Sequence, residues 1–93
     1  MNVLIGDIGN TITKICVIES NTLKILKTIY FNTNKIFSKN FLKKTLKKIF
    51  KKETICRVAL FSSVVPKYQT ILGNFLKKEY AIKLREIMEK NIK

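Results

Sequence analysis

The sequence predicts one α/β domain with the element order β-β-β-α-β-α-β, a mixed sheet flanked by helices. Three observations lead to this fold class. Residues 2–31 consist of short apolar or alternating runs separated by turn residues, residues 36–52 carry apolar side chains at helical spacing, and residues 54–61 form an almost unbroken apolar run. A length of 93 residues suits about one small domain, and an apolar share of 46% is ample for a packed core.

The first third of the chain is predicted to contain three consecutive antiparallel strands. Residues 2–6 are rich in Val, Leu and Ile, and the Gly-Asn pair at 9–10 is typical of a hairpin turn. Residues 12–19 alternate in part, and a second turn is expected at the Ser-Asn pair at 20–21. Residues 22–31 alternate more cleanly between the two faces of a strand.

An amphipathic helix is predicted over residues 36–52, after a polar linker at 32–35. Lysines in its last turn suit the negative end of the helix dipole. The apolar face is expected to hold Phe37, Phe41, Leu42, Leu46, Ile49 and Phe50, and the opposite face Lys43, Lys44, Lys47, Lys48, Lys51 and Lys52.

The second half is predicted to alternate strand and helix. Residues 54–61 have the continuous apolar character of a buried central strand. Pro66 suits the first turn of a second helix, because its missing N–H costs nothing there. Residues 81–87 are expected to form a last strand, and the tail at 90–93 to be frayed. The apolar face of the second helix is expected to hold Tyr68, Ile71, Leu72, Phe75 and Leu76.

The net charge of +13 has two explanations. Such a charge is typical of proteins that bind nucleic acid or an anionic membrane. The excess is almost entirely lysine, however, and the general bias toward Lys, Ile and Asn favours a solvated lysine surface. No apolar run approaches 18 residues, and the start MNVLIGD lacks the features of a secretory signal, so we expect a cytoplasmic protein without a membrane span.

The two cysteines, Cys16 and Cys56, each lie in an apolar run, and the chain contains no histidine. This pattern disfavours a zinc site, which needs clustered Cys or His ligands. Buried free thiols are the expected state, although the sequence leaves a disulfide between them open.

The stretch DIGNT, Asp7 to Thr11, lies between the first two predicted strands. Gly9 and Asn10 tolerate a left-handed turn, in which successive N–H groups can converge on an anion. Asp7, the only aspartate, would repel a bare phosphate, but it suits one that carries a divalent cation. These residues have the parts of a nucleotide-phosphate site. An ordinary tight turn between two strands is the alternative.

The DIGNT stretch occurs together with the sequence SSVVP at residues 62–66, directly after the buried strand. This combination resembles the first half of type III pantothenate kinases, over residues 1–80. These enzymes belong to the acetate kinase/sugar kinase/Hsp70/actin superfamily, so the resemblance implies a ribonuclease H-like, actin-like ATPase lobe. Phosphorylation of pantothenate by ATP, the first step toward coenzyme A, is the implied reaction.

The resemblance also implies the ligands and their site. ATP with Mg²⁺, a monovalent cation (K⁺ or NH₄⁺), pantothenate as substrate and a homodimer are expected. Asp7 would hold Mg²⁺ through the phosphates. Ser62 and Ser63 are interpreted as a capped strand-to-helix turn rather than as catalytic residues. The implied ATP- and phosphate-binding residues are Asp7, Ile8, Gly9, Asn10, Thr11, Ile12, Thr13 and Lys14.

The sequence departs from the family pattern in its acidic residues. Family members carry a G-x-D-R motif, whose aspartate is the general base, and a second phosphate motif, whereas this chain has no second aspartate. The resemblance implies that the general-base aspartate lies beyond Lys93. We therefore expect residues 1–93 to be the N-terminal lobe alone, with no catalytic residue and little activity by itself.

Two other functions are open alternatives to a kinase lobe. One is a non-catalytic basic binding module, and the other is a regulatory relative of the Bvg accessory factors, which share the two motifs. Nucleic acid is not expected as a partner, because the aromatic residues interleaved with the lysines of residues 36–52 fall on the apolar face.

Overall fold

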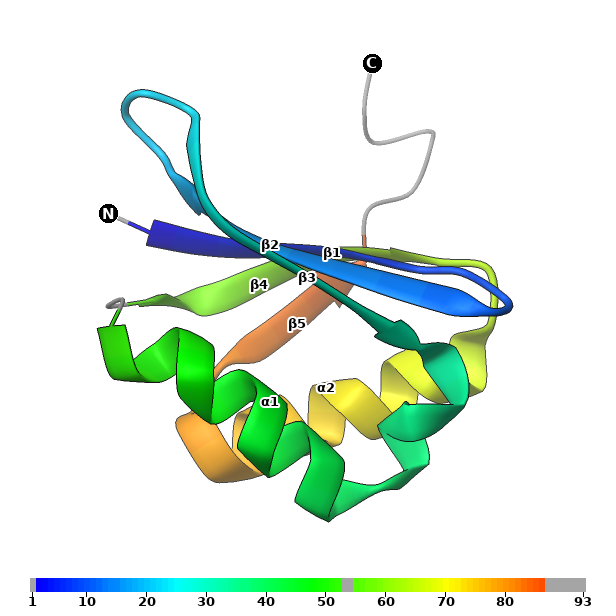
Figure 1. Cartoon of the computed structure of the whole chain (residues 1–93). Helices are drawn as coiled ribbons and strands as arrows, with labels where there is room; N and C mark the ends of the chain where they lie inside the picture. The colour runs from blue at the N-terminus through cyan, green and yellow to red at the C-terminus, as the bar shows by residue number, and fades with distance from the viewer. Residues whose placement is uncertain (1, 53–54, 87–93) are drawn as a thin grey trace.

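The computed structural model describes residues 2–52 and 55–86. Side-chain burial is described for all of these residues except 51, 52, 55 and 56. Five strands form one sheet in the order β3-β2-β1-β4-β5. The helices α1 and α2 and the short 3₁₀ helix η1 lie together on one face of this sheet (Figure 1). The elements are β1 (Asn2–Ile8), β2 (Ile12–Glu19), β3 (Lys24–Asn32), η1 (Thr33–Phe37), α1 (Lys39–Lys52), β4 (Ile55–Ser63), α2 (Pro66–Tyr80) and β5 (Lys83–Glu86).

The sheet is mixed, as the sequence predicts. β1, β2 and β3 form an antiparallel meander, while β4 pairs parallel to the central strand β1 and β5 pairs parallel to β4. The helical crossover that each parallel pairing requires is supplied by α1 and by α2. The predicted order of strands and helices is therefore confirmed, with η1 as an additional element.

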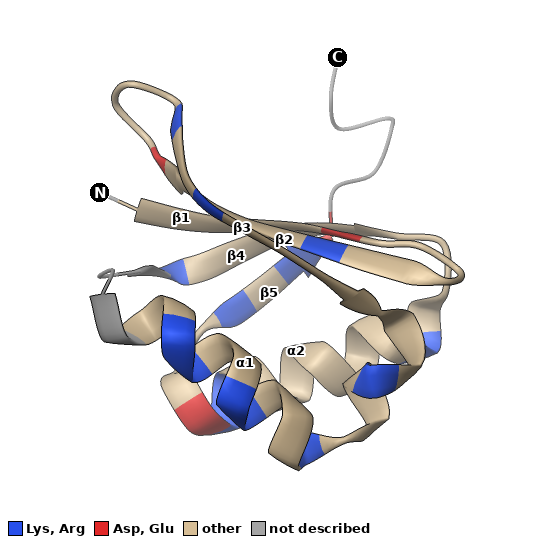
Figure 2. Cartoon of the chain, viewed as in Figure 1, with Lys and Arg blue, Asp and Glu red and all other residues tan. Residues whose placement is uncertain are grey.

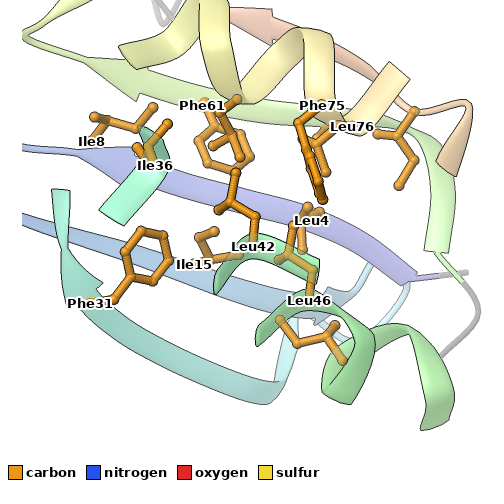
Figure 3. Close-up of a cluster of buried hydrophobic side chains, with 14 of the residues drawn as sticks. Leu4, Ile8, Ile15, Phe31, Ile36, Leu42, Leu46, Phe61, Phe75 and Leu76 are labelled. Atoms are coloured by element: carbon orange, nitrogen blue, oxygen red, sulfur yellow. The ribbon is translucent and has the colours of Figure 1, made fainter. Parts of the chain in front are cut away.

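The core lies between the sheet and the helical layer (Figure 3). Alternation along β1 places Leu4, Gly6 and Ile8 on the buried face and turns Asp7 to the opposite one. The remaining buried apolar side chains of this layer are Ile15, Val17, Phe31, Ile36, Leu42, Leu46, Ile49, Ala59, Phe61, Leu72, Phe75, Leu76 and Ile82.

The start of the first helix differs from the prediction. Residues 33–37 form η1, and α1 begins only at Lys39, so Phe37 does not continue the apolar face of α1. Ile36 is fully buried in its place, whereas the Phe37 side chain is 55% exposed and packs on Tyr68 with ring centroids 5.1 Å apart. Phe41 and Phe50 pack against the core as expected.

The third strand starts later and is less regular than predicted. Its first two expected residues belong to a turn in which the Glu19 carboxylate accepts hydrogen bonds from the N–H groups of Asn21 and Thr22. The register between β2 and β3 also shifts, because Val17 pairs with Lys27 but Ile18 pairs with Ile25. This bulge turns Leu26 toward the core and leaves Ile25 exposed, which breaks the expected alternation.

The other boundaries move by a few residues. β4 continues to Ser63, two residues beyond the predicted end. β5 (Lys83–Glu86) begins two residues later than predicted, because Ala81 ends α2 in the left-handed conformation. Cys16 is a buried free thiol, as predicted; the Cys56 side chain is outside the described set.

Some predictions fall on residues outside the described part of the chain. These are residues 54 and 87 of the predicted strands and the tail at 90–93, including Lys93. The expectation that the general-base aspartate lies beyond Lys93 is likewise not tested by the structure, and it stays a prediction.

Neither α1 nor α2 is long and apolar enough to cross a membrane, and the same holds for every helix within residues 2–52 and 55–86. The outer side of α1 instead carries a row of lysines (Figure 2). Those whose exposure is described are Lys39, Lys43, Lys44, Lys47 and Lys48, all exposed.

Gly6 provides a test of how closely β1 and β4 approach each other. A Cβ atom at this position would overlap the ring of Phe61, its pairing partner, which is fully buried. Because the ring has no free space to enter, we expect Gly6→Ala to lower the free energy of unfolding by about 1–3 kcal/mol, measured by urea denaturation.

Gly73→Ala is the matched control for this substitution. Its Cβ would lie 3.5 Å from Leu84 Cβ, an ordinary contact, and alanine favours the interior of α2. We expect Gly73→Ala to be neutral or to stabilise by up to about 1 kcal/mol. Equal effects of the two substitutions would contradict the close approach of Phe61 to Gly6.

Candidate phosphate-binding site

A row of polar side chains crosses four strands on the sheet face opposite the helices. Asp7 on β1 pairs with Lys14 on β2 and with Ser62 on β4, and Lys14 in turn pairs with Tyr30 on β3. Directly paired residues project from the same face of a sheet. Backbone register therefore places a carboxylate, an ammonium group, a serine hydroxyl and a tyrosine ring side by side at the carboxyl end of β1 and β4.

The Asp7 carboxylate is exposed and has a partner from the opposite half of the chain. The Ser62 hydroxyl donates a hydrogen bond of 2.9 Å to Asp7 Oδ1, across 55 positions of sequence. A carboxylate has further lone pairs, so this contact leaves the other oxygen able to accept a ligand.

Lys14 leans toward the outer strand of the row. Its Nζ atom lies 5.9 Å from the centroid of the Tyr30 ring, within cation–π range. Tyr30 and Lys14 are both exposed, so the ammonium charge is available to an anion that approaches the sheet face beside Asp7.

The hairpin after Asp7 is tight, but it is not left-handed. Gly9 and Asn10 could each tolerate a positive φ, but neither adopts one. Glycine is required for space instead, because a Cβ atom at Gly9 would lie 2.8 Å from the Ile12 carbonyl oxygen. The Gly9 N–H donates to that same oxygen at 3.1 Å, which leaves it unable to cradle an anion.

Thr33 joins this hairpin to the core. Its hydroxyl donates to the Gly9 carbonyl oxygen at 2.8 Å, and its backbone N–H donates to the Thr11 carbonyl oxygen at 2.8 Å. The hydroxyls of Thr33 and Thr13 also lie 2.8 Å apart, and both side chains are fully buried. Because the Thr33 proton is directed to Gly9, the Thr13 hydroxyl must be the donor between them.

The eight predicted phosphate-binding residues therefore divide by accessibility. The side chains of Asp7, Asn10, Thr11, Ile12 and Lys14 are exposed. Ile8 and Thr13 point into the core, so only their backbone could reach a ligand, and Gly9 has no side chain. The role of these residues in binding stays a prediction.

The two serines after the buried strand have different partners. Ser63 makes only local contacts: its hydroxyl donates to the Val65 carbonyl oxygen at 2.9 Å and accepts from the Val65 N–H at 3.1 Å. This agrees with the interpretation of a turn held by serine, but Ser63 does not cap α2 itself, because the N-cap residue of α2 is Val65 and has no side-chain cap hydrogen bond. Ser62 does not fit this interpretation, because its hydroxyl reaches Asp7, a contact that depends on register and is not encoded in the spacing of the two motifs.

The arrangement suits a phosphate that carries a divalent cation. Mg²⁺ in nucleotide sites is often held by one or two carboxylates together with phosphate oxygens, and Asp7 supplies one exposed carboxylate. Lys14 could supply positive charge for the phosphate itself. Within residues 2–52 and 55–86, no group of three or more His, Cys, Asp or Glu side chains could hold a metal ion.

Solved structures share this fold. A ROK-family transcriptional regulator, a homologue of the E. coli MLC protein, matches 91% of this chain and 27% of its own, with a TM-score of 0.58 and 11% identity. A Listeria monocytogenes protein described as a putative N-acetylmannosamine kinase matches 92% and 34%, with a TM-score of 0.55 and 15% identity. The Aquifex aeolicus PPX-GPPA enzyme matches 94% and 36%, with a TM-score of 0.51 and 18% identity. The actin-like ATPase fold predicted from the sequence is confirmed.

Sequence comparison then defines the family. The sequence model of type III pantothenate kinase matches residues 3–93. A type III pantothenate kinase from Pelagibacter ubique (strain HTCC1062) is 39% identical over 90 residues, which are 97% of this chain and 36% of that protein. The chain belongs to the type III pantothenate kinase family, and it spans about a third of the length of this relative.

Thr33 allows a directional test of the hairpin anchor. Thr33→Val removes the acceptor of the Thr13 hydroxyl and the donor to the Gly9 carbonyl oxygen, so buried polar groups lose partners. We expect a loss of about 1–3 kcal/mol in the free energy of unfolding and faster amide exchange at Gly9.

Thr13→Val is the control, because it leaves the bond from Thr33 to Gly9 intact. It should cost clearly less than Thr33→Val, and Gly9 exchange should hardly change. The assigned direction of the Thr13–Thr33 hydrogen bond is wrong if the two substitutions have the same effect.

Proposed function

We propose that residues 1–93 form the nucleotide-binding lobe of a kinase that phosphorylates pantothenate with ATP and yields ADP and 4′-phosphopantothenate. The observation that carries this proposal is the match of residues 3–93 to the type III pantothenate kinase family. The exposed Asp7 carboxylate at the carboxyl end of β1, with Lys14 beside it, supports a phosphate site there. In open α/β sheets this is the end at which ligands bind.

The residues of this lobe would act by positioning and by charge. Mg²⁺, when bound, would neutralise charge that develops on the transferred phosphoryl group. Asp7 would hold this ion directly or through water, and Lys14 would attract the phosphate oxygens. The exposed turn at Asn10 and Thr11 would contact the phosphates with its amide and hydroxyl groups.

The rest of the reaction is proposed to need residues outside 1–93. The pantothenate hydroxyl attacks the γ-phosphorus, the bond from this phosphorus to the β-phosphate oxygen breaks, and the hydroxyl proton passes to a general base. Asp7 is the only aspartate among these 93 residues. We propose that its carboxylate holds the Mg²⁺-bound phosphates and does not accept the hydroxyl proton. The same family resemblance supports a K⁺ or NH₄⁺ requirement, a homodimer and a cytoplasmic location as parts of the proposal.

Binding of Mg²⁺–ATP to the 93-residue chain is the direct test, measured by isothermal titration calorimetry. We expect Asp7→Ala to weaken binding at least about tenfold, because it removes the only carboxylate of the site, and chelation of Mg²⁺ by EDTA to have a comparable effect. Glu86→Gln removes one negative charge from β5, outside the site, and should leave binding unchanged.

Salt dependence separates this site from non-specific attraction by the lysine surface. Binding through several lysines alone should fall steeply between about 50 and 200 mM salt and should not require Mg²⁺. One observation favours this alternative. The exposed Phe37 ring, which we expected on the apolar face, lies 5.4 Å from Lys67 Nζ, so an aromatic side chain is accessible beside a lysine. A steep fall with salt combined with an unaffected Asp7→Ala variant would contradict the proposed site.

The 93-residue chain alone should show no pantothenate-dependent release of ADP above background. One lobe of the fold cannot surround the reacting groups and exclude water. Asp7 is assigned to the phosphates in this proposal, so no aspartate of these 93 residues acts as the general base. A coupled assay of ADP release with and without pantothenate measures this. Turnover that depends on pantothenate would show that these 93 residues already contain the general base.

A further inference from the structure

Ser62 and Ser63 are adjacent in sequence but are used differently in the structure. The hydroxyl of Ser63 bonds only within the turn to Val65. The hydroxyl of Ser62 donates to a residue of the neighbouring strand β1, Asp7, whose Oδ1 lies 2.9 Å away. A serine needed only to start α2 would have no reason to contact the carboxylate at the centre of the candidate site.

The backbone fixes the position of Ser62 relative to Asp7. β1 and β4 are paired from Leu4 with Ala59 to Ile8 with Ser63 without interruption, and Asp7 and Ser62 lie within this stretch. The ladder continues past them, because the Val64 N–H donates to the Ile8 carbonyl oxygen at 3.1 Å. Phe61, next to Ser62, is fully buried in the core, and its packing fixes the position of this part of β4. The serine hydroxyl is therefore held on a rigid support.

This contact bears on the side-chain order of Asp7. Its side chain is exposed on the open face of the sheet, where it would otherwise rotate among several staggered conformations. A carboxylate that must be ordered when its ligand arrives loses binding free energy to that ordering. A hydrogen bond to one of its oxygens restricts both side-chain torsions and leaves the second oxygen free.

We propose that Ser62 is a positioning residue, which holds Oδ1 of Asp7 so that the other carboxylate oxygen is presented to Mg²⁺–phosphate. The identity of this ligand rests on the proposed function. The restraint on Asp7, however, is present without any ligand. It gives the first serine of the SSVVP stretch a role in the site, whereas the second serine belongs to the turn.

The test uses the 93-residue chain and its single aspartate. Because Asp7 is the only aspartate, ¹³C,¹⁵N labelling of this residue type gives one carboxyl carbon signal to follow. Three-bond couplings from this carbon to the backbone nitrogen and carbonyl carbon report whether the Asp7 side chain occupies one conformation or averages over several. Mg²⁺–ATP affinity is measured in parallel by calorimetry, on the wild-type chain and on Ser62→Ala, Ser62→Thr and Ser63→Ala.

We expect one Asp7 conformation in the wild-type chain and conformational averaging in Ser62→Ala, with affinity for Mg²⁺–ATP about tenfold lower, the size of one hydrogen bond to a charged group. Ser62→Thr keeps the hydroxyl and should restore both measurements. Ser63→Ala removes a turn contact of equal length without touching Asp7, so it should change the stability of the chain but neither measurement.

The possible outcomes separate the positioning role from the proposed function. Averaged couplings in the wild-type chain, or a Ser62→Ala variant that keeps one Asp7 conformation and full affinity, would overturn the positioning role. A restrained Asp7 that averages in Ser62→Ala, in a wild-type chain that does not bind Mg²⁺–ATP, supports the restraint and overturns the proposed function. An unfolded Ser62→Ala variant is recognised by its amide spectrum. In that case the Asp7 couplings are compared between Ser62→Thr, which keeps the hydroxyl, and Ser62→Cys, whose thiol is a weak donor. Equal couplings in these two variants would overturn the positioning role.

Discussion

The parallel pairing of β1 with β4 holds the two halves of the sheet together and sets the position of the candidate site. It joins the N-terminal meander to the strand–helix–strand half of the chain, and within it the ring of Phe61 packs directly against Gly6. A Cβ atom at this position would overlap the ring, so the observed register, which pairs Gly6 with Phe61, requires glycine there. The same register sets Asp7 beside Ser62 one position further along. Packing on the buried face of the sheet therefore determines the chemistry on the open face.

The two faces of the sheet have different tasks. The face toward α1 and α2 is apolar and closed, with Leu4, Ile8 and Phe61 fully buried. The other face carries charged and polar side chains where β1 and β4 end. Strand alternation makes this division possible, because Asp7 can be exposed while both of its neighbours, Gly6 and Ile8, are buried. A charge can thus be held on a rigid strand without the desolvation cost of burial.

The hairpin after β1 is held by hydrogen bonds to the start of η1 rather than by its turn residues alone. Thr33, the first residue of η1, bonds to Gly9 and Thr11, and Thr13 completes a buried pair of hydroxyls. A tight turn at the surface would ordinarily be among the more mobile parts of a small domain. Here the hydroxyl pair connects it to the start of the helical layer, so the segment that the family resemblance assigns to ATP has a defined conformation before any ligand is present.

The sequence was enough to predict the element order, the apolar face of α2, most of the apolar face of α1 and the position of the DIGNT and SSVVP stretches. These depend on periodicities of two and 3.6 residues and on local turn chemistry. The sequence did not determine where α1 begins, as Phe37 shows, or that β3 contains a bulge, because the packing of other elements sets both. The three-dimensional fold was needed to establish that Gly9 is required for space and not for a left-handed turn, and that Thr13 is buried while Lys14 is exposed. The fold was also needed to bring Ser62 to Asp7, since the register of two strands 55 positions apart is fixed by side-chain packing and cannot be read from either strand alone.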